Sequence, residues 1–224
     1  MLNRRQRQMC IRDRLGISHE LRTPLSRMRL QLEFLDNEAD RESIKVEIAE
    51  MEKIVVSLLE AEKLSARHAP LNRSRINVND LIEDLVSDFF DRDRGRVKMQ
   101  VPTGALQANI DDARITLLLK NLIANALRYV SEEGGRVVVS ARQQDDDLVL
   151  TVEDNGPGMS SGQAEHIGEP FYRGDPSRTR DTGGTGLGLY LAFLVAKAHG
   201  GSLRLLNPDQ EGARFECRIP IHLT

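Results

Sequence analysis

The chain has 224 residues, of which 40% are hydrophobic and 29% are charged, and its net charge is −3. This composition is typical of a folded globular protein, and the charge gives no support for general binding to nucleic acid. No apolar run approaches the roughly 18 residues that a membrane span needs, no signal peptide pattern is present, and two cysteines, Cys10 and Cys217, favour a reducing compartment over a disulfide framework.

The first residues are set apart from the rest of the chain. The stretch MCIRDR at residues 9–14 resembles the translated end of a transposon used in preparing sequencing libraries. We therefore treat residues 1–14 as non-native sequence or a truncated linker and exclude them from fold reasoning. The alternative is an ordinary basic start of a helix.

Residues 15–67 are predicted to form two antiparallel helices. Apolar residues recur every three or four positions in two runs, which the turn residues DNEAD at 36–40 separate. A two-helix unit of this size buries too little surface to be stable alone, so we expect a homodimer that completes a four-helix bundle. The first run is Leu21, Leu25, Met28, Leu32 and Leu35, and the second is Ile44, Ile48, Met51, Val55 and Leu58.

A histidine lies within this first helix, in the stretch SHELRTPL at residues 18–25. At about 100° per residue, His19 points roughly 160° away from the centre of the first apolar run, which disfavours a core histidine. Glu20 can take a proton from the imidazole, Thr23 shares its face, and Pro24 should bend the helix there. The pattern predicts an outward-facing reactive histidine, and an ordinary solvated histidine is the alternative.

From residue 77 onwards, helical patterns alternate with short strands. Helices are predicted over about 77–90, 112–130 and 186–199, and strands over 97–101, 106–110, 135–142, 147–154, 201–207 and 213–220. This order predicts an α+β fold, a sandwich in which helices cover one face of a mixed sheet. Residues 68–76 are predicted to be a hinge between the hairpin and this second domain, 77–224.

One stripe of polar residues follows the helix predicted over 112–130. Asn121, Asn125 and Arg128 are spaced i, i+4 and i+7, opposite the apolar residues. Amide oxygens suit a Mg²⁺ ion held mostly by phosphates and water, and an arginine can bind phosphate. The alternative is a plain solvated face, although asparagine is a poor helix former.

A strand ends in DNGPGM at residues 154–159. Asp154 is expected to be partly buried and to need a donor, and an adenine amino group is one candidate. Gly156 and Gly158 permit close approach of a ligand to the backbone. A simple turn would also explain these residues.

The stretch GGTGLGL at residues 183–189 opens the last helix, and helix starts bind phosphate through backbone N–H groups. It matches neither the Rossmann fingerprint nor a P-loop. The preceding stretch, EPFYRGDPSRTRDT at 169–182, contains Arg173, Arg178 and Arg180. It is predicted to be a mobile lid, with a disordered surface loop as the alternative.

Together these stretches resemble the five boxes of sensor histidine kinases of two-component signalling. SHELRTPL resembles the H box, NLIANALRY the N box, DNGPG the G1 box, EPFYR the F box and GGTGLGL the G2 box, in the order of the family. The resemblance covers nearly the whole chain from Leu15. It implies a HisKA-type dimerisation and phosphoacceptor domain followed by a GHKL-type ATP-binding domain.

The resemblance implies a protein-histidine kinase that uses ATP and Mg²⁺. His19 would be the phosphoacceptor, Glu20 would assist proton removal, and Thr23 would support dephosphorylation of the partner. Asn121 and Asn125 would hold Mg²⁺, and Asp154 would bind the adenine amino group. The other nucleotide-binding residues that it implies are Arg128, Tyr129, Gly156, Gly158, Phe171, Arg173, Arg178, Gly184, Thr185, Gly186, Leu187 and Gly188. One departure is EGARFECRIP, where only Gly212 stands in place of a fuller glycine motif.

The implied partners are a second copy of the chain and the receiver domain of a response regulator, which would accept the phosphoryl group on an aspartate. Sensor and membrane segments are expected upstream, so the parent protein would lie in the inner (plasma) membrane with this part in the cytoplasm. Two rivals are a GHKL ATPase of the chaperone, mismatch-repair or topoisomerase kind, and a non-catalytic dimeric scaffold. SHELRTPL on a dimerising hairpin disfavours the first rival, and intact boxes disfavour the second.

Overall fold

The structure is a computed structural model that describes residues 28, 32, 37–65, 70–173 and 185–221. The chain divides into two compact units, Met1–Lys63 and Leu64–Thr224. The SHELRTPL stretch, and with it His19, Glu20 and Thr23, lies outside the described residues. Within the described residues, no helix combines the length and the apolar composition that crossing a bilayer requires.

Helix α2, Glu38–Ser65, begins in the first unit, and its last two residues, from Leu64, belong to the second. Its first turn carries Glu38 and Asp40 and its last turn carries Lys63, which matches the charge preference of the helix dipole. The predicted turn at 36–40 is therefore already helical from Glu38. Ile48 and Val55 pack against Leu32, so residues of the two predicted apolar runs meet, as expected of the hairpin.

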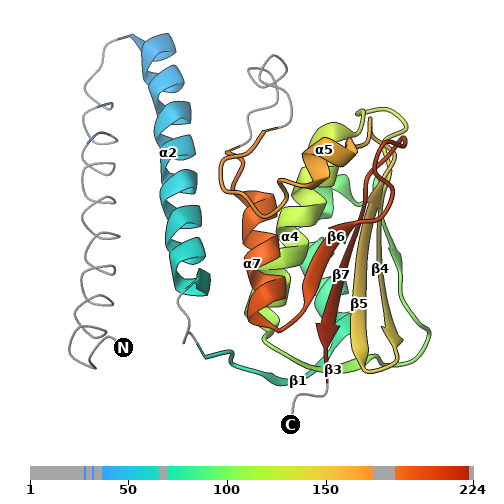
Figure 1. Cartoon of the computed structure of the whole chain (residues 1–224). Coiled ribbons are helices and arrows are strands. Elements are labelled where there is room, and N and C mark those ends of the chain that lie inside the picture. The colour runs from blue at the N-terminus through green and yellow to red at the C-terminus, as the bar shows by residue number, and fades with distance from the viewer. Residues whose placement is uncertain (1–27, 29–31, 33–36, 66–69, 174–184, 222–224) are drawn as a thin grey trace, which may run out of the picture. The chain divides into compact units, whose positions relative to one another are not determined.

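The second unit is a sheet with helices on one face (Figure 1). The sheet order is β2-β4-β5-β7-β6, in which β2 runs parallel to β4 and the other neighbours are antiparallel. The predicted mixed sheet is thereby confirmed. The strands are β2 Val97–Gln100, β4 Val137–Gln144, β5 Asp147–Asp154, β6 Ser202–Leu205 and β7 Arg214–Pro220.

A separate two-stranded sheet lies at one end of the helices (Figure 1). Strand β1, Ser74–Asn77, pairs antiparallel with β3, Gln107–Ile110, and Ser74 lies opposite Ile110. Residues 74–76 of the segment predicted as a hinge thus belong to a strand of the second unit.

Each main helix of the second unit begins at a side-chain cap or ends at a glycine. Helix α3, Val78–Phe90, is capped by Asn77, and α4, Asp112–Tyr129, is capped by Asp111, which accepts a hydrogen bond from the Arg114 N–H. Helix α7, Gly188–Ala198, ends before His199 and Gly200, whose positive φ of 78° suits glycine. The short elements are η1, Asp91–Asp93, and α5, Ser161–Ala164.

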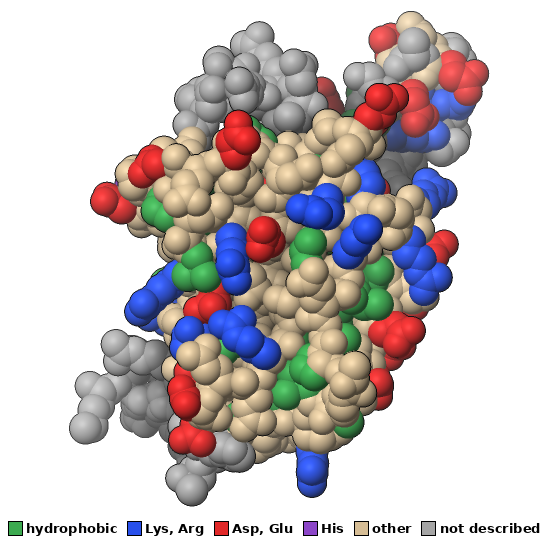
Figure 2. All heavy atoms as spheres, turned by 90° about the vertical axis from the view of Figure 1, so that its right-hand side faces the viewer, with side chains coloured by type: hydrophobic (Ala, Val, Ile, Leu, Met, Phe, Trp, Pro, Cys, Tyr) green, Lys and Arg blue, Asp and Glu red, His purple; other side chains and the backbone are tan. Residues whose placement is uncertain are grey.

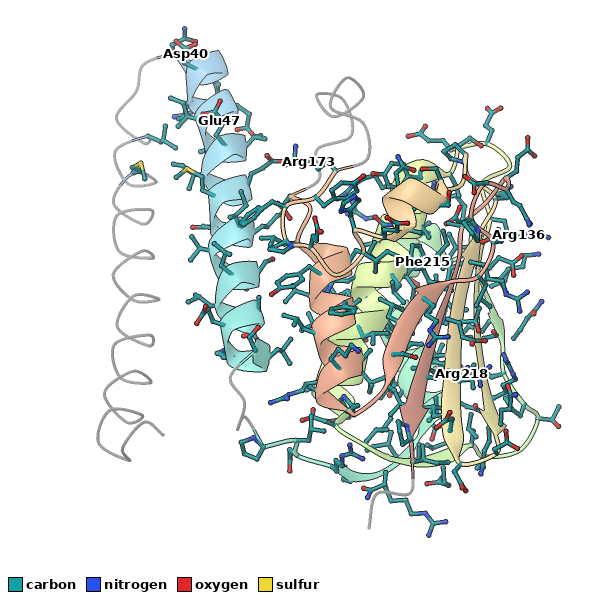
Figure 3. The ribbon with its side chains drawn as sticks, in the orientation of Figure 1. Asp40, Glu47, Arg136, Arg173, Phe215 and Arg218 are labelled. Carbon is teal, nitrogen blue, oxygen red and sulfur yellow. The ribbon has the colours of Figure 1, made fainter. Side chains whose placement is uncertain are left out.

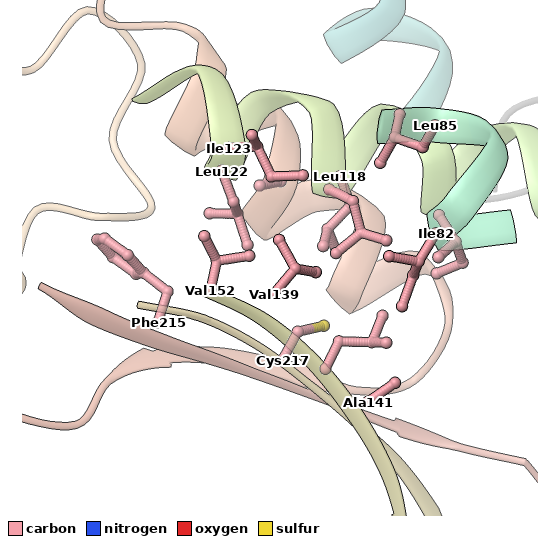
Figure 4. Packing of buried hydrophobic residues seen from close by; sticks show 14 of the residues in the cluster. Ile82, Leu85, Leu118, Leu122, Ile123, Val139, Ala141, Val152, Phe215 and Cys217 are labelled. Atoms are coloured by element: carbon pink, nitrogen blue, oxygen red, sulfur yellow. The ribbon is translucent and has the colours of Figure 1, made fainter. Parts of the chain in front are cut away.

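The core lies between the helices and the sheet (Figure 4). Alternate strand residues such as Val139, Val152 and Cys217 face Leu118 and Leu122 of α4 and are at most 2% exposed. Burial of such a side chain contributes roughly 1.5–3 kcal/mol. Burial also raises the pKa of the Cys217 thiol to about 12, so this cysteine is a neutral packing group.

A buried histidine joins the ends of two helices. His199 is completely buried, its Nδ1 lies 2.9 Å from the Val195 carbonyl, and its Nε2 accepts from the Asp111 N–H at 3.3 Å. An acceptor nitrogen carries no proton, so the ring is neutral. Burial lowers the pKa of His199, with the charges of Arg73 and Arg114 acting the same way against the Val195 carbonyl and Asp111.

This pKa shift predicts a loss of stability in mild acid. The unfolded chain takes up a proton at this histidine below about pH 6.5, whereas the folded chain resists protonation because its pKa is lowered. The stabilisation is therefore complete above that pH and falls by at most about 1.4 kcal/mol for each pH unit below it.

Urea unfolding of the second unit, followed at about pH 7.5 and about pH 5.5, measures this loss. A His199→Gln variant keeps an acceptor but does not titrate, so its stability should depend less on pH than that of the wild type. Equal pH dependence in the two proteins would contradict the prediction.

Candidate nucleotide-binding site

Helix α4 presents its polar stripe on the side away from the core. Its buried face consists of Ile115, Leu118, Leu119, Leu122, Ile123 and Ala126. Asn121 and Asn125 are half-buried, whereas Arg128 and Tyr129 are exposed. The stripe predicted from the sequence is therefore separate from the core and available to a ligand.

The start of helix α7 lies directly beside this stripe. A Cβ atom added at Gly188 would come within 2.8 Å of the Asn121 Oδ1, so the backbone of Gly188 and the side chain of Asn121 approach each other closely. The Asn121 Nδ2 donates to the Leu117 carbonyl at 2.8 Å, which leaves Oδ1 as the outward acceptor. An amide oxygen and the unpaired N–H groups of a helix start thus lie together.

Asp154 ends strand β5 and is only 8% exposed. Its Oδ1 accepts from the Gly156 N–H at 2.9 Å and from the Ala213 N–H at 3.2 Å. Burial raises the pKa of Asp154, although these two hydrogen bonds act to lower it, and Glu153 adds to the rise. Both bonds go to Oδ1, so within the described residues Oδ2 is the oxygen left for a donor on a ligand.

Two turns meet around this carboxylate by backbone contact. The Gly212 N–H donates to the Gly156 carbonyl at 2.8 Å, and a Cβ added at Gly212 would lie 2.2 Å from the Asp154 carbonyl oxygen. A Cβ added at Gly156 would lie 3.0 Å from the Tyr129 carbonyl oxygen. The end of α4, the 154–158 turn and the residues before β7 therefore enclose Asp154 together.

The sequence did not predict that Gly212 and Ala213 contact Asp154. In the sequence, Gly212 stood only in place of a fuller glycine motif. The contact joins Asp154 to a residue 59 positions later. The one available signal was a glycine placed just before a strand, where a positive φ or a close approach is common.

A backbone hydrogen bond joins the two sides of the arginine-rich segment, residues 169–182. The Phe171 N–H donates to the Gly186 carbonyl at 3.1 Å, and both residues have positive φ angles, 64° and 72°. A Cβ added at Gly186 would come within 2.7 Å of the Phe171 carbonyl carbon. Phe171 and Arg173 are exposed, and Figure 3 shows Arg173 beside this junction.

The predicted residues thus form three local groups: Asn121 with Gly188, Asp154 with Gly156 and the Tyr129 backbone, and Phe171 with Gly186. Arg178 and Gly184 lie outside the described residues. Thr185 accepts from the Leu187 N–H at 3.4 Å. Leu187 is completely buried, so only its backbone could contact a phosphate. Gly158, with φ 78°, packs against the Gln210 carbonyl and supports the turn.

A metal ion at this site would need ligands beyond acidic side chains. Among the described residues, no group of three or more His, Cys, Asp or Glu residues is placed to hold one. The Asn121 Oδ1 accepts no hydrogen bond from the part of the chain that the structure describes, and it fits a Mg²⁺ ion that takes its other ligands from phosphates and water.

A hollow of about 230 Å³ adjoins the Asp154 turn on the side of the sheet away from the helices. Asp154 and Gly212 of the candidate site line it together with Arg136, Val138, Glu153, Asn155 and Glu211. Glu216 pairs with Arg142 at 3.2 Å and with Arg218 at 2.7 Å. Burial acts to raise the pKa of Glu216, but the two arginines keep this pKa below its usual value. Figure 2 shows acidic and basic side chains interspersed on this side, so the charges are largely neutralised within the surface.

Two families of known proteins match the chain, one in each unit. Residues 110–223 match the family of histidine kinase-, DNA gyrase B-, and HSP90-like ATPases. Residues 16–67 match the His Kinase A (phospho-acceptor) domain. The first match contains every described residue of the candidate site.

Known proteins are similar to this chain in sequence and in fold. The chain is 35% identical over 215 residues to the sensor protein RstB of Escherichia coli K12, which covers 92% of this chain and 48% of RstB. It therefore spans about half the length of that relative. Full-length ShkA in complex with AMPPNP matches 95% of this chain and 46% of its own, with a TM-score of 0.75 at 24% identity. A complex of histidine kinase ThkA with response regulator protein TrrA matches 98% of this chain and 64% of its own, with a TM-score of 0.66 at 22% identity.

The backbone contact at Gly212 predicts a large cost for adding a side chain. Gly212→Ala would meet both an unfavourable φ of 72° and the Asp154 carbonyl. Gly134→Ala is the matched control, because Gly134 has a φ of 77° but no atom within 4 Å of an added Cβ. We expect the Gly212 variant to lose roughly 1–3 kcal/mol more stability than the control. Thermal unfolding of both variants tests this, and equal losses would contradict it.

Proposed function

The chain belongs to the sensor histidine kinases, and we propose that it phosphorylates its own His19 with ATP and then transfers the phosphoryl group to an aspartate of a response regulator. The observation that carries the proposal is the union in one chain of a phospho-acceptor domain at 16–67 and an ATPase-family domain at 110–223. A histidine in SHELRTPL lies within the first of these.

We propose the following division of the chain. Residues 15–67 form the dimerisation and phosphotransfer hairpin, 68–76 the connection, and 77–224 the ATP-binding domain, with 1–14 as non-native or truncated sequence. The division of the structure into Met1–Lys63 and Leu64–Thr224 supports a boundary near this connection.

Each group of site residues then has a proposed part in holding ATP. Asp154 binds the adenine amino group, with Gly156, Gly158 and Tyr129 beside the base. Gly184, Thr185, Gly186, Leu187 and Gly188 bind phosphates through backbone N–H groups, helped by Arg128, Phe171, Arg173 and Arg178 around the lid. Asn121 and Asn125 hold Mg²⁺, which neutralises charge on the phosphates when it is bound. The complex of ShkA with AMPPNP supports an ATP site in this fold.

The reaction is a displacement at the γ-phosphorus of ATP. An imidazole nitrogen of His19 attacks, the bond to the β,γ-bridging oxygen breaks, and ADP leaves. Glu20 accepts the proton that the ring loses. An unperturbed imidazole is mostly neutral near pH 7, with a pKa of about 6.5, so the ring is available as a nucleophile. The phosphoryl group then moves from nitrogen to the carboxylate oxygen of the regulator.

A second copy of the chain is the proposed partner of the hairpin. Ile44, Met51 and Leu58 recur every seven residues along α2 and are 37%, 48% and 36% exposed. They form one stripe, whereas Ile48 is buried in a cluster with Leu32, against which Val55 packs. An apolar heptad stripe left uncovered in one chain is typical of a bundle completed by another chain.

The partner protein and the cellular location are proposed from the similar proteins. The complex of ThkA with TrrA supports a receiver domain as the partner, and we propose that Thr23 also supports dephosphorylation of that partner. The chain spans about half of RstB. We therefore propose a longer parent protein, anchored in the inner (plasma) membrane by segments upstream, with this part on the cytoplasmic side.

Labelling with γ-labelled ATP and Mg²⁺ tests the proposed reaction. We expect the wild type to acquire acid-labile label, as an N–P bond should give, and His19→Gln to acquire none. His222→Gln is the control that keeps the label. Label that persists in His19→Gln would refute the phosphoacceptor, and ATP hydrolysis without labelled protein would favour the rival ATPase.

Asp154→Asn tests the proposed adenine contact. An asparagine keeps an Oδ1 that accepts from Gly156 and Ala213, but it turns an NH₂ group towards the adenine amino group, so two donors meet. Loss of this charge-assisted bond, about 1.5–3 kcal/mol, should weaken ATP binding by roughly 10–100-fold. Glu153→Gln, on the opposite face of β5, should leave the affinity within about twofold. Calorimetric titration measures both, and unchanged affinity in Asp154→Asn would contradict the assignment.

A further inference from the structure

The chain that enters the second unit is bound at the end of α4 and α7 remote from the nucleotide residues. Four side chains make this basal cluster: Arg73, Asp111, Arg114 and His199. Asp111 is 5% exposed and His199 is completely buried. None of the four belongs to the five sequence boxes or to the candidate site, so the cluster needs an explanation of its own.

Three hydrogen bonds tie the incoming residues 70–73 to this cluster. The Asn72 N–H donates to the Asp111 Oδ2 at 2.9 Å. The Arg73 guanidinium donates to the His199 carbonyl at 3.1 Å, and the Arg114 guanidinium donates to the Pro70 carbonyl at 3.4 Å. The bond to the Asp111 carboxylate is short and charge-assisted, which makes it the strongest kind of the three, whereas the Arg114 bond is long and exposed.

The same cluster joins the two helices of the nucleotide site to each other. Asp111 caps the first turn of α4 through the Arg114 N–H, and its own N–H donates to the His199 imidazole at 3.3 Å. From there α4 runs to Asn121, Asn125 and Arg128, while α7 leads back to Gly188 beside Asn121. The incoming chain is thus connected to the phosphate end of the site through two packed helices.

β1 extends this attachment. Ser74–Asn77 pairs with β3, whose last residue, Ile110, precedes Asp111. Asn77 then caps α3. From Pro70 to the start of α3, the chain is consequently held by side-chain and strand hydrogen bonds of the second unit.

We infer that Asp111 and His199 are positioning residues, which fix residues 70–77 to the base of α4 and α7 so that this segment moves with the ATP-binding unit and sets the direction in which ATP is delivered to His19. This inference rests on the proposed autophosphorylation. It shortens the predicted hinge, 68–76, because residues 70–76 are attached to the base of α4 and α7 and do not act as a pivot. Misdirection of the unit would slow phosphoryl transfer, since transfer depends steeply on alignment, without weakening ATP binding.

Hydrogen exchange of the whole chain tests the attachment without using activity. We expect the amides of residues 71–77 to be protected in the wild type. In Asp111→Asn, whose single amide oxygen cannot accept from both the Arg114 N–H and the Asn72 N–H, their exchange should rise at least about tenfold, while residues 148–152 of β5 change by less than about twofold. Unprotected amides at 71–77 in the wild type, or equal increases in both segments of the variant, would overturn the inference.

A second variant, at the less buried Arg73, tests the effect on rate. Arg73→Met removes the bond to the His199 carbonyl and keeps the aliphatic part of the side chain. We expect autophosphorylation at saturating ATP to slow at least about fivefold, with the affinity for ATP unchanged within about twofold. Arg75→Met, an exposed arginine of β1, is the matched control and should keep the wild-type rate.

The outcomes separate the two proposals. A wild type that acquires no label on His19 contradicts the proposed function, whatever the exchange data show. A wild type that is labelled, together with an Arg73→Met variant that is labelled equally fast, contradicts the positioning role alone. A variant that loses ATP affinity in proportion to rate would also overturn it, because the site itself would then have changed.

Discussion

The packing of α4 against the sheet is the constraint on which the second unit depends. Leu118, Leu119, Leu122 and Ile123 are at most 1% exposed, so the rotation of this helix about its axis is fixed by the core (Figure 4). Once the rotation is fixed, Asn121 must lie beside α7 and the helix end must lie beside Gly156. Core packing of α4 is therefore sufficient to orient the polar stripe.

Backbone contact completes the site where side chains would take too much space. Gly188, Gly156, Gly186 and Gly212 each stand where an added Cβ would meet another part of the site. Such contacts bring N–H groups and a carboxylate close together with little side-chain entropy to lose. They also explain why a buried carboxylate is tolerated at Asp154, because two backbone N–H groups hold its Oδ1.

Local patterns were sufficient to predict the helices, the mixed sheet and the polar stripe, because each follows from periodicity within a few turns. They could not predict contacts set by topology. The Ala213 N–H that binds Asp154 is 59 residues away, and the His199 ring that binds Asp111 is 88 residues away. The predicted apolar run of α2 likewise could not show that Ile48 is buried within one chain while Met51 is left exposed. Leu187 was assigned to the nucleotide because of the motif around it, although its side chain is in fact buried.

The proposed binding and delivery of a nucleotide place different demands on the second unit, and the two ends of α4 and α7 would each meet one of them. The end near Asp154 and Gly188 carries the N–H groups of a helix start and side-chain oxygens that are only partly paired within the described residues. The other end uses a neutral buried imidazole and a carboxylate whose hydrogen bonds are all made within the protein, which suits a rigid joint. A charged ring there would lose the acceptor that Asp111 needs, so burial that keeps His199 neutral also keeps the two helices and the incoming chain in one body. A domain that must turn as a unit can align a phosphate only if its attachment does not bend, and this cluster supplies that stiffness at the point where the chain enters.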